Sequence, residues 1–564
     1  MIGFLDFSSI VSTLLTITLL NTAVILALLS TFLSNRFWFP TLAAVVLTQL
    51  ISPWLLYFAG RARFMKRSST RKNSVIQHVR REQENFETQE RLSPKSEDEG
   101  WENFQGYAVE SLENGAPAKS EWDGVVGFLH PFCNAGGGGE RVLWAAIKAT
   151  QEHWPRAICV VYTGDHGSAK STILERVESR FNIHLHPPTV VFLYLDKRDW
   201  VVASTWPYFT LLGQILGSLY MAYEALSLLT PDVFVDTMGY AFSLWLCKFF
   251  FPSIPTGAYV HYPFIGTHMV ESLTDDSGQG VNAGAGRGVK GFGKKLYWYF
   301  LVKLYAWTGS SIDVVMTNSS WTQAHMQHLW GQSRKRCPRP VEVVFPPVAV
   351  EELIEKISLE GANIVAREDI LVYIAQFRPE KNHELILQAF SRMVHSQSGA
   401  RTEGARLILI GSVRDDEDKT LVYKLRLQAT ELKIADRVEF RTQDISWSEI
   451  LDWLRKASVG VNGMWCEHFG IGVVEYQAAG LISVVNDSGG PKADIVVDYD
   501  GGPTGKPILS IVIVPTRLSR FLTLMFYGRL SRNHRNRICH ALCLRPLHAS
   551  WPSNSHAPPR PLLE

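Results

Sequence analysis

The chain has 564 residues, of which 46% are hydrophobic and 20% are charged, and its formal net charge is +2. This length predicts two or three folded units, and the globular composition excludes a wholly disordered or collagen-like chain. A near-neutral chain without a zinc-finger or stacked-aromatic motif is not expected to bind nucleic acid. The seven cysteines are scattered and odd in number, which is typical of a reduced, cytosolic protein.

Two long apolar runs open the chain. No charged residue occurs from 7 to 35, and a second uncharged run extends from 37 to 60. A helix needs roughly 20 apolar residues to cross a bilayer, so we expect a transmembrane anchor of one or two helices within residues 1–70. A long buried hairpin is the alternative. Basic residues follow directly, from Arg61 to Lys72, and the positive-inside bias would keep them and the rest of the chain in the cytosol.

Residues 71–120 mix both charges with Ser, Gln and Glu and show little apolar periodicity. This composition predicts a polar linker that is helical at most in part.

From residue 121 to about 505, short apolar runs alternate with helical stretches. The first series includes GVVGFLHPF, RAICVVYT, TVVFLYL and DVVMTNS; the second begins with VEVVFPPV and continues through DILVYIAQF, ARLILIGS and ISVVND. Such alternation is typical of parallel sheets covered by helices. We therefore predict an α/β protein with two Rossmann-like, doubly wound domains, 121–338 and 339–505, that face each other across a cleft.

Three stretches between these strands are unusually apolar and aromatic: 208–229, 242–252 and 295–307. They are interpreted either as core helices or as a surface that enters the bilayer interface, where Trp, Tyr and Lys are favoured.

Four glycines, Gly136 to Gly139, separate the first apolar run from a helical stretch that begins near Glu140. Glycine lets backbone N–H groups converge on an anion, and a helix N-terminus adds a favourable dipole. The motif therefore predicts that Gly137, Gly138 and Gly139 bind a phosphate. A flexible glycine loop is the alternative.

Two glutamates, Glu467 and Glu475, flank the start of a later helix that contains Gly470 and Ile471. Carboxylates accept hydrogen bonds from hydroxyls, and the helix N-terminus between them would face a diphosphate. The pattern predicts a site for a polyol joined to phosphate. In the alternative, Glu467 only caps the helix and Glu475 lies on a solvated face.

Five segments carry a resemblance to a known family: HPFCNAGGGGERVLWAAI, YVHYPFIGTHM, TNSSWT, AQFRPEKNHELILQAF and EHFGIGVVEYQAAGLISVVNDSGGPKAD. The last resembles the donor-binding segment of retaining GT-B glycosyltransferases. Together they look like the GDP-mannose-dependent, dolichol-linked oligosaccharide α-1,2-mannosyltransferases of the endoplasmic reticulum, over residues 123–505. The resemblance implies a GT-B fold and transfer of the fourth and fifth mannoses to a dolichol-diphosphate oligosaccharide in protein N-glycosylation, on the cytosolic face of that membrane.

The resemblance also implies roles for individual residues. Glu467 would bind hydroxyls of the transferred hexose, and Glu475 would bind the ribose of the donor. Arg378 and Lys381 would neutralise the diphosphate, which gains negative charge as it leaves. Many relatives place the arginine two positions earlier, where this chain has Gln376.

His261, in the run YVHYP, matches a position beside the reacting sugar and would orient and stabilise it. A loop histidine bonded to backbone is the alternative. The predicted donor-binding set is completed by Gly470, Ile471, Ser488, Gly489 and Gly490.

The resembling family generally uses side-chain cations, so neither a metal ion nor another cofactor is expected. Asp498 and Asp500 have the spacing of metal-dependent transferases, but a solvated turn explains them. The expected partners are GDP-mannose, the dolichol-diphosphate oligosaccharide, the endoplasmic reticulum membrane and other mannosyltransferases of the same pathway.

The resemblance stops at residue 505. Residues 506–564 carry nine Lys or Arg residues and one acidic residue and end rich in proline. We interpret this atypical tail either as the product of an altered reading frame or retained intron, or as a basic membrane-contacting segment.

Two other functions remain open from sequence alone. The same fold could serve another lipid-linked acceptor, such as a phosphatidylinositol glycan. The chain could also be a catalytically silent scaffold of a glycosylation complex.

Overall fold

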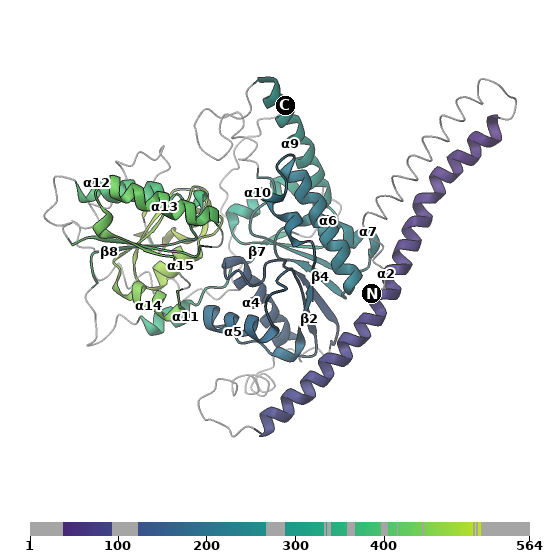
Figure 1. Cartoon of the computed structure of the whole chain (residues 1–564), viewed down its shortest axis with the longest axis horizontal. Coiled ribbons are helices and arrows are strands. Elements are labelled where there is room, and N and C mark those ends of the chain that lie inside the picture. The colour runs from purple at the N-terminus through teal and green to yellow at the C-terminus, as the bar shows by residue number, and fades with distance from the viewer. Residues whose placement is uncertain are drawn as a thin grey trace.

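Two parallel sheets form the cores of two domains (Figure 1). The computed structural model describes residues 38–92, 122–266, 288–331, 334, 340–357, 367–395, 404–413, 416–442, 445–499, 502–503 and 506–508. The predicted α/β class with parallel sheets is confirmed.

The N-terminal domain contains a seven-stranded sheet in the order β3-β2-β1-β4-β5-β6-β7, with every pair parallel. The strands are β1 (Val125–Leu129), β2 (Ile158–Thr163), β3 (Val190–Tyr194), β4 (Val233–Asp236), β5 (Thr256–Val260), β6 (Val314–Thr317) and β7 (Val341–Val343). Strands β1, β2 and β5 are buried at every position, because helices cover both faces of the sheet.

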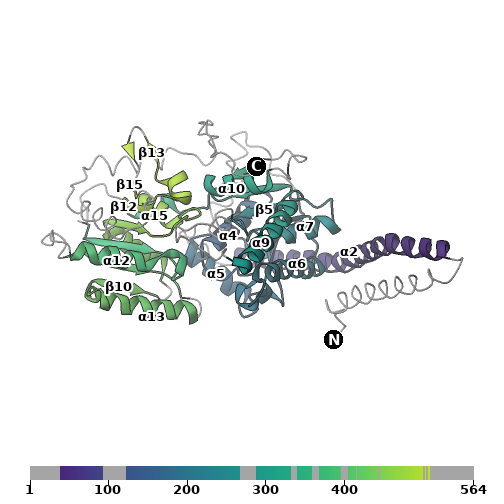
Figure 2. The same ribbon diagram turned by 90° about the horizontal axis from the view of Figure 1, so that it is seen from above.

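The helices of this domain are α4 (Gly138–His153), α5 (Lys170–Phe181), α6 (Thr210–Leu228), α7 (Ala241–Phe250), α9 (Gly288–Gly309) and α10 (Ser320–Trp330). One hydrophobic cluster joins the sheet to α6, α7, α9 and α10, and another joins the opposite side to α4 and α5. Figure 2 shows the two domains side by side, with the long helix α2 extending from the N-terminal domain on the side away from the second domain.

The C-terminal domain contains a six-stranded parallel sheet in the order β10-β9-β8-β11-β12-β15. Its strands are β8 (Ile370–Ile374), β9 (Arg406–Ile410), β10 (Val438–Arg441), β11 (Val459–Asn462), β12 (Ile482–Asn486) and β15 (Lys506–Ile508). Its helices are α11 (Val350–Lys356), α12 (His383–Val394), α13 (Asp416–Glu431), α14 (Trp447–Lys456) and α15 (Ile471–Ala478). A short hairpin joins β13 (Asp498–Tyr499) to β14 (Gly502–Pro503).

Each sheet reverses its strand order once, between β1 and β4 in the first and between β8 and β11 in the second. Loops leave in opposite directions at such a point and open a crevice at the carboxyl ends of the strands, where ligands of doubly wound folds bind. The glycine motif follows β1, the segment with Lys381 follows β8, and the segment with Glu467 follows β11. The topology therefore brings the predicted site segments to these two crevices.

Two strands correct the predicted domain boundaries. The segment VEVVFPPV was assigned to the second domain, but β7 pairs with β6 and completes the first sheet. It follows β6 through the single helix α10, and a strand–helix–strand crossover places the second strand beside the first. Residues Lys506–Ile508, assigned to the atypical tail, pair with β12 as an edge strand, where Pro507 is tolerated. Residues 509–564 lie outside the described residues.

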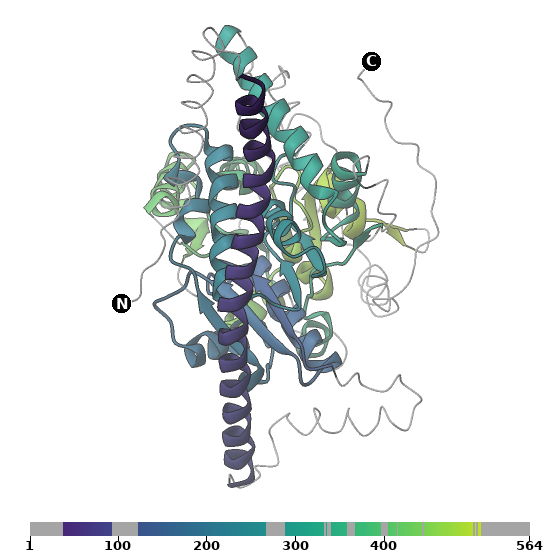
Figure 3. The same ribbon diagram turned by 90° about the vertical axis from the view of Figure 1, so that its right-hand side faces the viewer.

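The helix α2 (Trp38–Leu92) is continuous through residue 70, where the sequence predicted a change from anchor to linker. It packs along the N-terminal domain on the side remote from the second sheet (Figures 1 and 3). Phe64 contacts the rings of Tyr223 and Phe250, and Lys72 pairs with Asp232 at 2.6 Å. Up to Leu92 the predicted linker is therefore a docked helix, because these tertiary contacts stabilise it.

The predicted transmembrane anchor is not seen in the described part of the chain, where no helix is both long and apolar enough to cross a bilayer. The first apolar run, 7–35, lies outside that part, so the anchor stays a prediction.

The aromatic stretches are partly buried and partly exposed, and their contact with a membrane stays a prediction. Ile215, Leu244 and Leu301 are buried in the core, which accounts for one face of α6, α7 and α9. On α9, Phe292 and Phe300 are 70% and 60% exposed. These helices therefore contribute to the core and also present large apolar side chains to their surroundings.

Candidate active site between the two domains

A cavity of about 430 Å³ lies between the two domains and is lined by loops from both sheets. Nine of the predicted site residues line it: Gly137, Gly138, Gly139, His261, Lys381, Glu467, Gly470, Ile471 and Glu475. Four do not: Arg378, Ser488, Gly489 and Gly490. The roles of all thirteen stay predictions.

Glu467 and Lys381 form the closest charged pair of the cavity. Lys381 Nζ donates to Glu467 Oε2 at 2.6 Å, and Asn462 Nδ2 lies 3.4 Å from the same oxygen. Burial acts to raise the pKa of Glu467, but the charges of Lys381 and His468 and these hydrogen bonds outweigh it, so the pKa is lowered. Glu467 is therefore an ionised acceptor at the end of β11.

The loop Ser488–Gly489–Gly490 contacts the backbone of Cys466 and Glu467. Gly490 N–H donates to the Glu467 carbonyl at 2.7 Å, and Ser488 Oγ accepts from Cys466 N–H at 2.8 Å. Gly489 has φ +69°, and a side chain there would overlap the Glu467 carbonyl. These residues hold the backbone that carries Glu467, and none of them lies on the cavity wall.

Glu475 lies on the second turn of α15 and is 6% exposed. Its Oε1 is 3.6 Å from Nη1 of Arg141, which comes from α4 of the other domain. Burial raises the pKa of Glu475 to about 7, although the charge of Arg141 opposes this. The carboxyl predicted to bind ribose is thus shared with a cation from the opposite domain.

The N-termini of α4 and α15 both reach the cavity. An added Cβ at Gly138 would lie 2.8 Å from Cδ1 of Ile471, so the two helix starts are in close contact. Gly137 N–H donates to Glu140 Oε2 at 2.5 Å, which removes that group from the predicted phosphate donors. The first N–H groups of a helix have no intrahelical partner, so Gly138 and Gly139 carry the anion-binding capacity of this loop.

Gly470 caps the start of α15 with φ +103°, a backbone conformation that residues other than glycine rarely adopt. This turn directs the start of α15 into the cavity beside Glu467.

His261 follows β5 and lines the cavity from the N-terminal domain. Burial and the nearby His130 lower the pKa of His261 to about 4, against the opposing effects of Glu140 and of a hydrogen bond with the Thr237 backbone. Its Nε2 is shielded from solvent and has no hydrogen-bond partner among the described residues. The ring is therefore neutral at physiological pH.

Gln376 lines the cavity, whereas Arg378 lies outside the wall and pairs with Glu380 at 3.6 Å. The segment turns after β8, which directs Gln376 and Lys381, but not Arg378, toward the interior. This geometry weakens the predicted contact of Arg378 with phosphate.

The cavity wall also contains residues that sequence reasoning missed, among them Arg141, Arg180 and His468. Arg141 could have been found, because a cation directly after a glycine motif lies in the first turn of the anion-facing helix. His468 stacks on Tyr262 of the other domain, with ring centroids 4.1 Å apart and planes at 16°. No sequence pattern predicts this stacking contact, because it depends on how the two domains pack against each other.

The cavity thus combines carboxylates for hydroxyl groups with cations and helix N-termini for a diphosphate. It is suited to hold a nucleotide-diphosphate sugar, with the charge of the leaving group offset by fixed side chains. Within the ranges covered by the structure, no group of three or more His, Cys, Asp or Glu side chains is placed to hold a metal ion.

Two family models match the chain: "ALG11 mannosyltransferase N-terminus" over residues 123–330 and "Glycosyl transferases group 1" over residues 356–507. A Neurospora crassa protein named GDP-Man:Man(3)GlcNAc(2)-PP-Dol alpha-1,2-mannosyltransferase is 61% identical over 423 residues, which cover 73% of this chain and 76% of that protein. The human protein of the same name is 43% identical over 384 residues, which cover 68% of this chain and 76% of the human protein. A UDP-forming trehalose-phosphate synthase from Burkholderia xenovorans shares the fold at 12% identity, with a TM-score of 0.51, over 75% of this chain and 95% of its own. The chain belongs to the family of GDP-Man:Man(3)GlcNAc(2)-PP-Dol alpha-1,2-mannosyltransferases.

Proposed function

We propose that this protein transfers mannose from GDP-mannose to a dolichol-diphosphate-linked oligosaccharide and forms α-1,2 linkages. The observation that carries the proposal is that Glu467, Glu475 and Lys381 of one domain line the same cavity as the glycine loop of the other. The name of these relatives specifies an acceptor with three mannoses, so the first sugar added is the fourth. We infer that the same site adds the fifth.

In the proposed donor complex, the ionised Glu467 accepts hydrogen bonds from mannose hydroxyls, and Glu475 accepts them from ribose. Lys381, Arg141 and the N-terminus of α4 face the diphosphate. Bond cleavage increases negative charge on GDP, and preorganised cations stabilise that charge more in the transition state than in the ground state. Side chains supply these cations, so the proposal includes no metal ion.

His261 presents a neutral ring to the cavity, and its unpartnered Nε2 can accept a hydrogen bond from a sugar hydroxyl. A ring with a pKa of about 4 is a poor proton donor near neutral pH. We infer that His261 orients the mannose, and that the leaving phosphate helps to deprotonate the acceptor hydroxyl on the same face, with retention of configuration.

A lipid-linked acceptor requires contact with a membrane. Helices α6 and α9 carry exposed apolar residues, and lysines lie against the aromatic rings: Lys294 is 5.5 Å from the ring centroid of Trp298, and Lys303 is 5.2 Å from that of Tyr299. Aromatic rings and lysines together favour the bilayer interface. We propose that this surface contacts the endoplasmic reticulum membrane from the cytosolic side.

The test is a transfer assay with purified full-length protein, GDP-mannose and a dolichol-diphosphate acceptor bearing three mannoses. The expected products carry one and two additional mannoses that an α-1,2-specific mannosidase removes. Glu467→Gln, which keeps the shape but removes the charge, should lower the rate on the order of 100-fold.

Two outcomes would reject the proposal. Transfer to a phosphatidylinositol glycan, but not to the dolichol-linked acceptor, would assign the cavity to another substrate. No transfer from any nucleotide sugar, with Glu467→Gln indistinguishable from the parent, would indicate a silent scaffold.

A further inference from the structure

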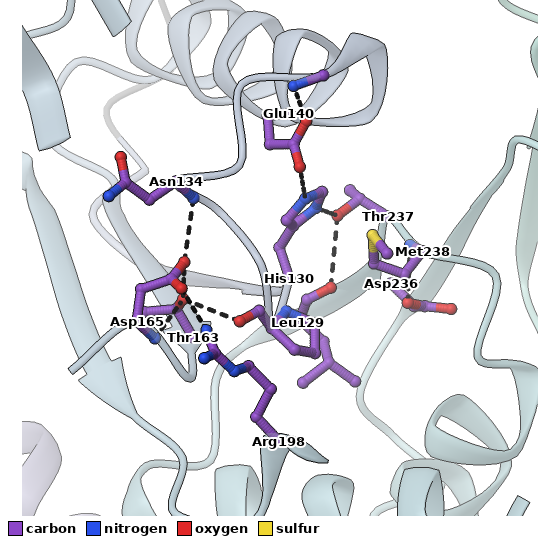
Figure 4. Close-up of polar contacts among 12 residues, drawn as sticks. Leu129, His130, Asn134, Glu140, Thr163, Asp165, Arg198, Asp236, Thr237 and Met238 are labelled. Atoms are coloured by element: carbon purple, nitrogen blue, oxygen red, sulfur yellow. Dashed lines mark hydrogen bonds and ion pairs between the residues drawn. The ribbon is translucent and has the colours of Figure 1, made fainter. Parts of the chain in front are cut away.

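A buried polar chain lies behind the cavity wall and centres on His130, which follows β1 and is 0% exposed (Figure 4). His130 Nδ1 is 2.7 Å from Thr237 Oγ1, and His130 Nε2 is 4.0 Å from Glu140 Oε1. None of these three residues lines the cavity. His130 follows β1 and Thr237 follows β4, the two strands between which the first sheet reverses its order.

One end of this chain holds the glycine loop. Glu140 is 7% exposed, and its Oε2 accepts the hydrogen bond from Gly137 N–H. Burial acts to raise the pKa of Glu140, but His130 and the Gly137 hydrogen bond outweigh it, so the pKa is lowered. An ionised carboxylate only accepts hydrogen bonds, which suits it to clamp a backbone N–H.

The other end holds His261. Nε2 of the His261 ring has no partner within the described residues, and an added Cβ at Gly139 of the glycine loop would lie 3.6 Å from it. The ring therefore lies against the glycine loop at the edge of the cavity. Hydrogen bonding to the Thr237 backbone opposes the fall in the pKa of His261, and the Thr237 hydroxyl contacts His130, which connects His261 to the same buried chain.

We propose that His130, Glu140 and Thr237 are positioning residues for mannosyl transfer, which fix His261 relative to the glycine loop. The inference rests on the proposed function, because it assumes that the loop binds the diphosphate and that His261 contacts the sugar of the same donor. Sugar and diphosphate are joined, so a shift of either contact displaces the bond to be broken from its reactive geometry.

Thr237→Val is the main test, because valine keeps the shape and the backbone of threonine but cannot bond to His130. We expect kcat for transfer from GDP-mannose to fall at least tenfold, while the affinity for GDP, which lacks the sugar, changes less than twofold. Thr237→Ser, which restores the hydroxyl, should recover most of the rate.

Glu140→Gln tests the loop end independently. The amide keeps an oxygen for Gly137 N–H but loses the charge that faces His130. We expect the affinity for GDP to fall about three- to tenfold, in contrast to the effect of Thr237→Val.

Gln151→Met is the matched control on the same helix, α4. Gln151 is buried and hydrogen-bonds to His186 and Thr189, away from the buried polar chain of His130, Glu140 and Thr237 and away from the cavity. It should lower thermal stability without changing kcat or the GDP affinity. The inference is overturned if Thr237→Val transfers mannose at the parental rate, or if its loss of activity matches that of Gln151→Met at equal loss of stability. A parent protein that transfers nothing from GDP-mannose would instead overturn the proposed function.

Discussion

Arg141 and Glu475 meet across the two domains, with 3.6 Å between Nη1 and Oε1 and each side chain only 9% exposed. A buried ion pair of this kind adds little net stability, because desolvation offsets the attraction of the charges. Breaking it from one side is costly, since a buried charge loses its partner. The pair therefore links the relative position of the domains to the carboxyl proposed to bind ribose.

Substitution of Glu475 should change how stability depends on pH. The folded protein keeps a proton on Glu475 up to about pH 7, whereas the unfolded chain releases it near the ordinary value of 4.5. Between these values the unfolded state binds fewer protons, so raising the pH lowers the free energy of unfolding. Glu475→Gln removes this effect, and its stability relative to the parent should rise by at most about 1.4 kcal/mol per pH unit in that window.

Urea unfolding of parent and variant between about pH 5 and pH 8 measures this difference. Titrations of His261 and Glu467 are common to both proteins and cancel in the comparison. Parallel pH profiles would contradict the assignment of a raised pKa to Glu475.

Two substitutions of Lys381 should separate the contribution of its charge to stability and activity from that of its shape. Lys381→Met leaves Glu467 without its cation, so we expect a loss of stability on the order of 3 kcal/mol and a fall in kcat on the order of 100-fold. Lys381→Arg keeps the charge and should retain more activity. The double variant Lys381→Met/Glu467→Gln should regain stability but no activity, as judged by thermal melting and initial rates; recovery of both would rule out a role in transfer.

The contact between Gly138 and Ile471 offers a test of domain approach. Gly138→Ala introduces a Cβ 2.8 Å from Ile471 Cδ1 and should lower kcat/KM on the order of tenfold, because it separates the two helix starts. Ile471→Val removes that methyl carbon, and the double variant should recover part of the rate. If Ile471→Val fails to improve Gly138→Ala in steady-state assays, the steric explanation is wrong.

Docking of α2 should be visible in the stability of the N-terminal domain. Phe64 is 7% exposed, and its ring centroid lies 5.0 Å from that of Tyr223. Phe64→Ala should cost about 3–5 kcal/mol and lower the melting temperature, with little change in the affinity for GDP. The adjacent Met65 is 52% exposed, and Met65→Ala is the control that should melt like the parent. Equal melting of the two variants would show that α2 is not held by these contacts.

Much of the fold is readable from the sequence, because buried parallel strands are short apolar runs and the site loops follow them directly. The positions of Glu467, Lys381 and His261 on the cavity wall follow from that rule. The place of β7 in the first sheet could not be predicted from the sequence, since an apolar run does not show which sheet the strand joins. The docking of α2 was missed for a related reason: its contacts are tertiary.

The parts of the site that escaped prediction depend on packing between segments. Ser488 to Gly490 were predicted to bind the donor; in the structure they lie outside the cavity wall and contact the backbone next to Glu467, and their role toward the donor stays a prediction. Arg378 was predicted to bind phosphate, and the turn after β8 places Gln376 rather than Arg378 on the cavity wall. Composition and spacing identify which segments meet, whereas the direction of each side chain is decided by the turn that carries it.

The edge strand β15 has a consequence for any shortened form of this protein. A chain stopped at residue 505 would keep every proposed catalytic group but would uncover the backbone amides and carbonyls of β12 that β15 now occupies. Exposed strand edges recruit strands from other molecules. Such a truncated enzyme would self-associate in solution, so loss of its activity would report aggregation rather than a missing catalytic residue.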